Sequence, residues 1–159
     1  MADLLQFAAN HAVVTCPLGP RTRTFIGRKD SSVAAPDGLM PDVNSDANTL
    51  IKLFEDKTIT PHMLAALVGA HTTSEQFFVD PKKAGWPQDG TPGIWDTKFY
   101  SQTTSQQVPA RVFRLNSDVV LANDSRVADE WAQFAGPGGQ SHWNEVCIFA
   151  LVDFQQTAR

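Results

Sequence analysis

The chain has 159 residues, a length that fits one folded domain with a hydrophobic core of its own, and we expect a single domain over residues 1–159. Hydrophobic residues make up 42% and charged residues 19%, which excludes an intrinsically disordered protein. The formal net charge of −4 predicts no basic face, so nucleic acid is not an expected partner, and no apolar run is long enough to span a membrane.

The first third of the chain predicts two helices separated by a long loop. Apolar residues on one helical face predict a helix over residues 2–14, which Cys16-Pro17 ends. Residues 17–44 are rich in Gly, Pro, Asp and Arg and predict a structured loop, in which residues 25–28 suit a short strand. Ser45 then suits the N-cap of a helix that runs to Phe54.

Two Thr-Pro pairs predict the starts of further helices. Thr60-Pro61 begins a helix that runs to about His71, and Thr91-Pro92 begins one near 92–101. An extended piece is expected at 113–115, followed by helices over 117–123, 125–134 and 141–154, with a glycine-rich break at 136–139. The chain is therefore predicted to be all-α, with an irregular multi-helix arrangement rather than a simple bundle.

The N-terminus and the cysteines say little about the compartment. Residues 1–14 lack a basic start and a clear cleavage site, so they do not predict a signal peptide. Cys16 and Cys147 are either bridged or free, and they show no zinc-binding pattern.

His71 is the first candidate for a functional residue. It falls on the apolar face of its helix with Leu64 and Leu67, where that helix ends. Such a histidine is either a hydrogen-bonded core residue or a ligand to a metal such as haem iron. A ligand needs an acceptor for its other ring N–H, and Asp118, which stands in an apolar segment, is the candidate. The alternative for Asp118 is a helix N-cap, because Ser117-Asp118 starts an apolar run.

The loop DGTPGIWD, residues 89–96, is the second candidate. Together with Thr72, its side chains at Asp89, Thr91 and Asp96 offer clustered oxygens, and its glycines allow backbone carbonyls to turn inward. Carboxylate, hydroxyl and carbonyl oxygens are the ligands that Ca²⁺ prefers. The alternative is a surface turn in which Thr91 caps a helix.

Four tryptophans have two possible roles. Such residues carry electrons to a surface or, more often, pack in the core or at its boundary. They are Trp86, Trp95, Trp131 and Trp143.

Several motifs follow one another in one collinear run over residues 2–145: ADLLQFAANHAVVTCPLGP, FIGRKD, LVGAHTTS, DGTPGIWDTKFY and VFRLNSDVVLANDSRVADEWAQFA. Together they resemble the plant-type haem peroxidases, and within them the fungal class II, lignin and manganese peroxidase-like, group. They are similar to the proximal, C-terminal half of such a peroxidase only. The end, residues 146–159, does not resemble the family ending.

The resemblance implies two cofactors, haem b and Ca²⁺. His71 would be the proximal ligand of the haem iron, and Asp118 would accept the hydrogen bond from its other ring nitrogen. The calcium ligands would be Thr72, Asp89, Thr91, Asp96 and, through its carbonyl, Ile94. The resemblance also implies a secreted oxidoreductase that reduces hydrogen peroxide while it oxidises small aromatic donors.

The resemblance is incomplete on the distal side. The family's distal histidine and arginine have no match, since His11, His62 and His142 stand in other contexts. Cys16 has the position of a family disulfide cysteine, whose partner is expected upstream of Met1. We therefore expect weak activity from this chain alone. We also expect an apolar face, over residues 2–14 and 60–71, that self-association or a missing distal half covers. The alternative is a non-catalytic, calcium-stabilised interaction protein.

Overall fold

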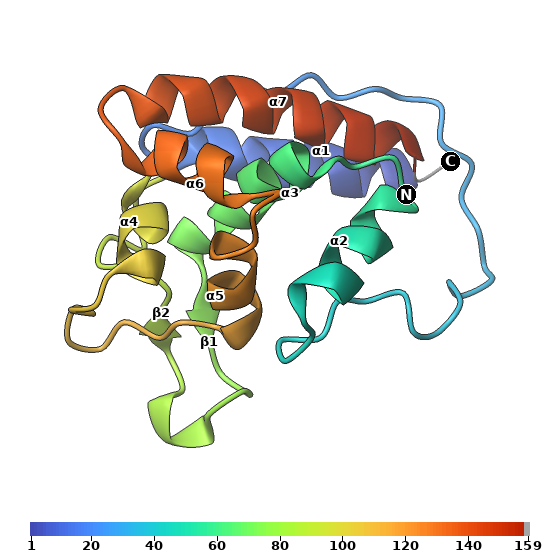
Figure 1. The fold of residues 1–159 in the computed structure, drawn as a ribbon. Coiled ribbons are helices and arrows are strands. Elements are labelled where there is room, and N and C mark those ends of the chain that lie inside the picture. The colour runs from blue at the N-terminus through green and yellow to red at the C-terminus, as the bar shows by residue number, and fades with distance from the viewer. Residues whose placement is uncertain (158–159) are drawn as a thin grey trace.

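Residues 1–157 are described in a computed structural model, which is mostly helical, so the predicted all-α class is confirmed (Figure 1). The α-helices over these residues are α1 (Ala2–Thr15), α2 (Ala47–Glu55), α3 (Pro61–Val68), α4 (Lys98–Thr104), α5 (Asn116–Ala122), α6 (Ala128–Ala135) and α7 (Gly139–Thr157). A small antiparallel sheet pairs β1 (Glu75–Gln76) with β2 (Trp86–Pro87). Two 3₁₀ helices complete the described elements, η1 (Gly69–Thr73) and η2 (Pro81–Lys83).

Helix α3 lies at the centre of the fold and packs against α7, which runs along one side with α1 beside it (Figure 1). The core around α3 combines small side chains with large aromatic ones. Its fully buried aromatic residues are Phe99, Tyr100, Trp131, Phe134 and Trp143. The β1–β2 hairpin projects from the opposite end of the molecule (Figure 1). None of the helices within residues 1–157 is long and apolar enough to cross a membrane.

Helix starts were predicted with mixed success. Thr60 caps α3 and Pro61 occupies its first turn, as the sequence predicts. Helix α2 is capped by Asp46 rather than Ser45, since the Asp46 carboxylate accepts a hydrogen bond from the backbone N–H of Thr49 at 3.1 Å. The predicted helix near 92–101 begins only at Lys98. Thr91 does not cap a helix, because its hydroxyl donates to a carboxylate oxygen of Asp96 at 2.9 Å.

Neither predicted extended segment is a strand. Residues 25–28 are irregular, and Gly27 has a φ of +117°, which does not suit a regular strand. Residues 113–115 make one backbone hydrogen bond to the sheet region, from Phe113 N–H to the Pro87 carbonyl at 2.8 Å, without forming a strand.

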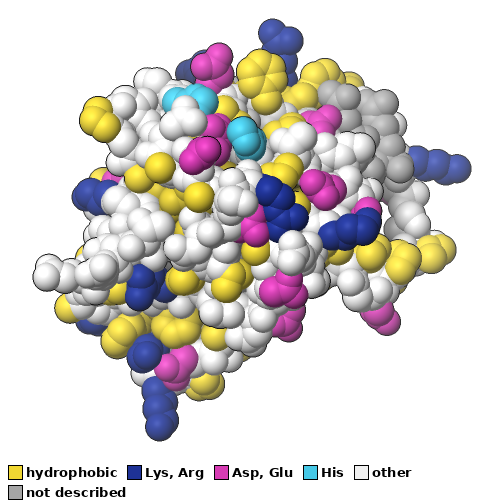
Figure 2. Space-filling view, in the orientation of Figure 1, with side chains coloured by type: hydrophobic (Ala, Val, Ile, Leu, Met, Phe, Trp, Pro, Cys, Tyr) yellow, Lys and Arg dark blue, Asp and Glu magenta, His cyan; other side chains and the backbone are white. Residues whose placement is uncertain are grey.

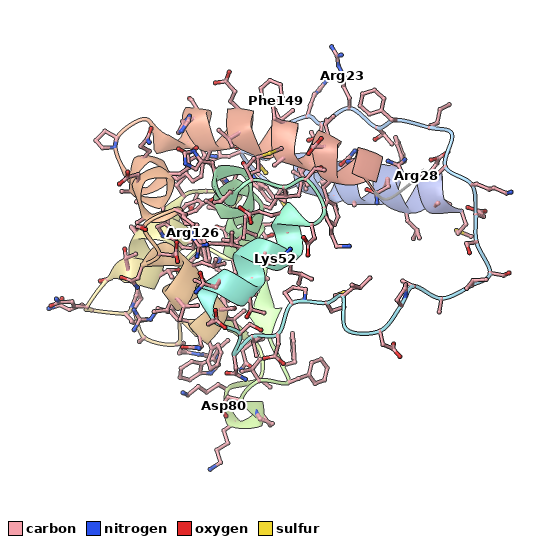
Figure 3. The ribbon with its side chains drawn as sticks, turned by 45° about the vertical axis from the view of Figure 1, so that its right-hand side comes forward. Arg23, Arg28, Lys52, Asp80, Arg126 and Phe149 are labelled. Atoms are coloured by element: carbon pink, nitrogen blue, oxygen red, sulfur yellow. The ribbon has the colours of Figure 1, made fainter. Side chains whose placement is uncertain are left out.

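Helix α7 is longer than predicted, and its C-terminal part is tied to the start of the chain. The Gln155 side chain is buried and donates to the Asn10 side-chain oxygen of α1 at 2.9 Å. The Arg28 guanidinium donates to the Gln155 carbonyl at 2.6 Å and pairs with Asp3 of α1 at 3.0 Å. Figure 3 shows Arg28 lying beside this part of α7. Residues 158 and 159 of the atypical ending lie outside the described residues.

The predicted bare apolar face is found on α1 but not on α3. Leu4, Leu5 and Phe7 are between 56% and 63% exposed, and the buried residue of α1 is the polar Asn10. Leu64 of α3, by contrast, is only 2% exposed, because α2 and α5 pack over it. The expectation for α3 was therefore wrong in part.

On the face seen in Figure 2, Lys and Arg side chains are dispersed among acidic and apolar ones. Both cysteines within residues 1–157 are free thiols, and burial raises the pKa of Cys147 to about 12. Of the two cysteine states that the sequence left open, the structure therefore shows the unbridged one.

Candidate functional site

An apolar hollow opens beside His71, between α2, α3 and α5. Its walls are the side chains of Val43, Leu50, Phe54, Leu64, Leu67, Val68, Leu115 and Leu121. His71, Ser117 and Asp118 form its polar end, and Asp42 also lines it. A mostly apolar ligand that can accept one nitrogen donor suits such a lining.

The short turn that follows α3 positions His71. The α-helix ends at Val68 and continues as the 3₁₀ helix η1, so His71 and Thr72 leave one turn in different directions. Thr72 is fully buried, whereas the His71 side chain is 34% exposed. His71 and Thr72, although adjacent in the chain, therefore lie in two different environments.

The structure brings His71 and Asp118 together. His71 Nδ1 lies 3.0 Å from a carboxylate oxygen of Asp118, whose side chain is 1% exposed. Asp118 does not cap α5, because the start of that helix has no side-chain cap. A carboxylate can only accept here, so Nδ1 carries the proton and Nε2 keeps a free lone pair.

The Asp118 carboxylate also makes the His71 imidazole more basic. Burial lowers the pKa of His71, but the negative charge of Asp118 and its hydrogen bond raise the pKa by more, so the net shift is upward. A more basic imidazole is a stronger electron donor to a metal. The second oxygen of Asp118 is buried with no hydrogen-bond partner among residues 1–157, so no other hydrogen-bond donor of these residues competes with His71 for this carboxylate.

A second set of polar groups meets on the other side of η1. The Thr72 hydroxyl donates to the Asp89 carboxylate and lies 3.3 Å from the Ile94 carbonyl oxygen. The Thr91 hydroxyl lies 2.9 Å from an Asp96 carboxylate oxygen and 3.5 Å from one of Asp89. The five groups named from the sequence therefore converge, although they are spread over residues 72–96.

This oxygen cluster carries negative charge without a neutralising side chain. No ion pair within residues 1–157 includes Asp89 or Asp96. Burial raises the pKa of Asp89, hydrogen bonds from Thr72 and Thr91 offset part of that rise, and the charge of Asp96 adds to it. A buried carboxylate beside a second one is unfavourable unless a cation compensates, so this donor set fits a hard cation.

Some residues of the site escaped the sequence analysis. Val43 reaches the hollow from the long loop, where its carbonyl accepts the Ser117 N–H at 2.9 Å. Gln88 is buried beside His71, where the Ser74 hydroxyl contacts its side chain. No local pattern marks Val43, because its place at the hollow depends on a contact with α5, far along the chain. Gln88 directly precedes the predicted loop at 89–96, and only its contact with Ser74 reveals its place.

The other histidines lie away from the hollow. His142 of α7 is 3.0 Å from the Glu130 carboxylate of α6, and His11 stacks on Phe7 of α1. His62 lies in the first turn of α3. None of the three lines the hollow beside His71.

A family match covers the elements that build both clusters. The family model for peroxidases matches residues 1–137, which include the His71–Asp118 pair and the oxygen-rich loop. The chain belongs to the peroxidase family. The resemblance drawn from the motifs alone is thereby confirmed at the level of the family.

The similar peroxidases are fungal proteins more than twice as long. Ligninase C of Trametes versicolor is 34% identical over 84% of this chain and 41% of its own length. A versatile peroxidase of Pleurotus eryngii is 33% identical over 82% of the chain and 39% of its length. Manganese peroxidase 3 of Phlebia radiata is 34% identical over 84% of the chain and 41% of its own length. The peroxidase chain described here therefore spans about two-fifths of these relatives.

Proposed function

We propose that this chain is the haem-binding, proximal part of a secreted peroxidase that reduces hydrogen peroxide and oxidises small aromatic donors. The observation that carries the proposal is the His71–Asp118 pair at the polar end of an apolar hollow. Haem b, when bound, would supply the redox chemistry, exchanging electrons with peroxide and donor.

The protein's own groups have distinct tasks in this proposal. His71 would hold the iron through Nε2, while Asp118 keeps the proton on Nδ1 and fixes the orientation of the ring. The apolar walls would pack against the macrocycle and exclude water. These donors and this lining fit haem.

The oxygen cluster would bind one Ca²⁺ through Thr72, Asp89, Thr91, Ile94 and Asp96. Because Thr72 and His71 are neighbours in η1, a cation that holds Thr72 also restrains the backbone of His71. The calcium site would thereby keep the iron ligand in place.

A second candidate function is that of a non-catalytic, calcium-stabilised interaction protein. Peroxide cleavage needs a base to move a proton and a cation to stabilise the departing oxygen. Among residues 1–157, His71 is the only histidine that lines the hollow, and no arginine or lysine of this part of the chain lines it. The proton-accepting nitrogen of His71 is the proposed iron ligand. This observation favours the second candidate for the chain acting alone.

Titration with haem separates the two candidates. We expect a Soret band that saturates at equimolar haem, with peroxide-dependent oxidation of an aromatic donor little faster than that by haem in an unrelated apolar pocket. Absence of a specific Soret band would favour the interaction protein. Fast turnover that saturates with peroxide would contradict the expected weakness of the isolated chain.

Replacing Asp118 by asparagine should raise the Fe(III)/Fe(II) midpoint potential of the haem complex. The neutral amide no longer stabilises positive charge on the imidazole and the iron, so the oxidised state loses more stability than the reduced state. Spectroelectrochemistry measures the shift. Asp129→Asn, a change in α6 away from the hollow, is the matched control, and equal potentials in both variants would argue against the pairing.

The exposed face of α1 should cause self-association. Leu4, Leu5 and Phe7 lose contact with water when two copies meet, and buried apolar area contributes about 25 cal/mol per Å². Light scattering over a dilution series should show an apparent mass that rises with concentration. Leu5→Gln with Phe7→Gln should weaken the association, whereas Ile26→Gln in the long loop should not. A monomer at all concentrations would refute this expectation.

A further inference from the structure

A second hollow lies between α1 and the long loop that follows this helix. Residues 7–14 of α1 form one wall, and Arg21, Thr22 and Thr24 of the loop form the other. Its volume is about 370 Å³. It shares no lining residue with the hollow beside His71, so it is a separate site.

The polar groups of this second hollow are hydrogen-bond donors that lack acceptors. No ion pair within residues 1–157 includes Arg21. The Thr22 hydroxyl is buried with no hydrogen-bond partner in the same part of the chain, which costs stability unless a ligand supplies one. None of the described residues that line the hollow is acidic. The hollow therefore suits an anion.

A buried amide holds the two walls of the hollow together. Asn10 of α1 is only 6% exposed, and its side-chain nitrogen donates to the Thr24 hydroxyl oxygen at 2.8 Å. Its side-chain oxygen accepts from Gln155 of α7 at 2.9 Å, so the amide is fixed from both ends. Because Thr24 accepts a hydrogen bond here, its own O–H remains available to donate to a ligand.

The wall formed by α1 is aromatic and apolar. The rings of Phe7 and His11, one helical turn apart, lie nearly parallel, with centroids 6.0 Å apart and an interplanar angle of 14°. Phe7 is 56% exposed, and Val14 extends the apolar wall along the helix. His11 also carries a ring N–H in either protonation state. An anion that enters this hollow can therefore place an attached ring against the Phe7 and His11 rings.

We propose that this second hollow binds a monocyclic aromatic carboxylate. The Arg21 guanidinium takes the carboxylate, because its planar fork of donors matches two carboxylate oxygens, and the Thr24 hydroxyl donates to the same group. The ring packs against Phe7 and His11. This site needs no haem and goes beyond the proposed function.

Nuclear magnetic resonance titration of the full chain with benzoate tests the proposal. The protein is kept at the low end of the dilution series, where self-association through α1 is weakest. We expect saturable shifts of the His11 ring signals and of the Thr24 amide. The ring signals of His62 and His142 should stay in place, because neither residue lines the hollow. Shifts centred on His71, or no saturable shift up to tens of millimolar benzoate, would overturn the proposal.

Two arginine variants separate a specific site from general attraction between charges. Arg21→Gln should weaken benzoate binding about tenfold, because a charge-assisted hydrogen bond is lost. Arg23→Gln is the matched control, since it removes the same charge from the same loop but does not line the hollow. Figure 3 shows the Arg23 side chain projecting away from the ribbon. Arg23→Gln should bind benzoate as wild type does, and equal weakening in both variants would overturn the proposal.

Two further ligands test the chemistry on wild type, so this part of the test does not depend on the folding of a variant. Benzamide has the ring without the charge, and acetate has the charge without the ring. Each should bind about tenfold more weakly than benzoate, and equal affinity for either would contradict the proposed ligand class. Failure here is distinct from failure of the proposed function, because benzoate binding is measured without haem and the Soret band without benzoate.

Discussion

Gly69→Ala should lower the melting temperature strongly, although the backbone at Gly69 is an ordinary right-handed turn. A Cβ atom at this position would lie 2.1 Å from the Tyr100 hydroxyl oxygen and 2.6 Å from Trp143 Nε1. Both groups are buried and hydrogen-bonded to carbonyls of α3, so neither can move without losing its partner. Overpacking of this kind costs about 1–3 kcal/mol and sometimes more.

Thermal unfolding followed by circular dichroism measures the effect. Each kcal/mol corresponds to about 2–4 °C for a domain of this size, so we expect a fall of roughly 5–10 °C. Gly136→Ala is the control, because the nearest atom to its new Cβ is 3.4 Å away. Because Gly69 begins η1, the haem affinity of Gly69→Ala should fall as well. A melting temperature equal to that of wild type would contradict this prediction, because it would show that Tyr100 and Trp143 can shift to accept the extra methyl group at little cost in stability.

Removal of calcium should produce a second large loss of stability. A ligand that binds only the folded state stabilises it by about 2.7 kcal/mol at a concentration 100 times its dissociation constant, which is roughly 5–10 °C in melting temperature. Without the cation, the buried Asp89 carboxylate faces Asp96 with no neutralising side chain among residues 1–157. Chelation should therefore weaken the turn that carries His71.

Melting curves with calcium and with a chelator test this prediction. The double variant Asp89→Ala with Asp96→Ala should melt at one temperature in both conditions. Asp56→Ala, which removes an exposed carboxylate that pairs with Lys52, should keep the wild-type response. If wild type melts identically in both conditions, the oxygen cluster is a hydrogen-bonded turn and not a cation site.

Local sequence patterns predicted helix ends that depend only on neighbouring residues. Thr60 and Pro61 predict the start of α3, and the helix begins there in the structure. The same Thr-Pro pattern failed at Thr91, because the side chain that would cap a helix there is bound within the oxygen cluster. Here the tertiary contacts of the oxygen cluster outweigh the local preference of Thr91 for a helix N-cap.

The candidate site was visible in the sequence only in part. His71, Asp118 and the loop at 89–96 could be named from residue types and a resemblance, and the structure brings the two residues of the pair within 3.0 Å. Val43 could not be named, because no periodicity or motif marks it and it reaches the hollow from the long loop. Gln88, which directly precedes the loop at 89–96, was not named because no motif marks it.

The central claim is that His71 binds haem iron. Replacing His71 by glycine leaves a space for free imidazole, so the most direct measurement is the Soret spectrum of haem-loaded His71→Gly with and without imidazole. The variant should lose the wild-type band and regain it when imidazole is added, with circular dichroism unchanged throughout. An unaltered Soret band in His71→Gly without imidazole would contradict the claim, since another group would then be the ligand.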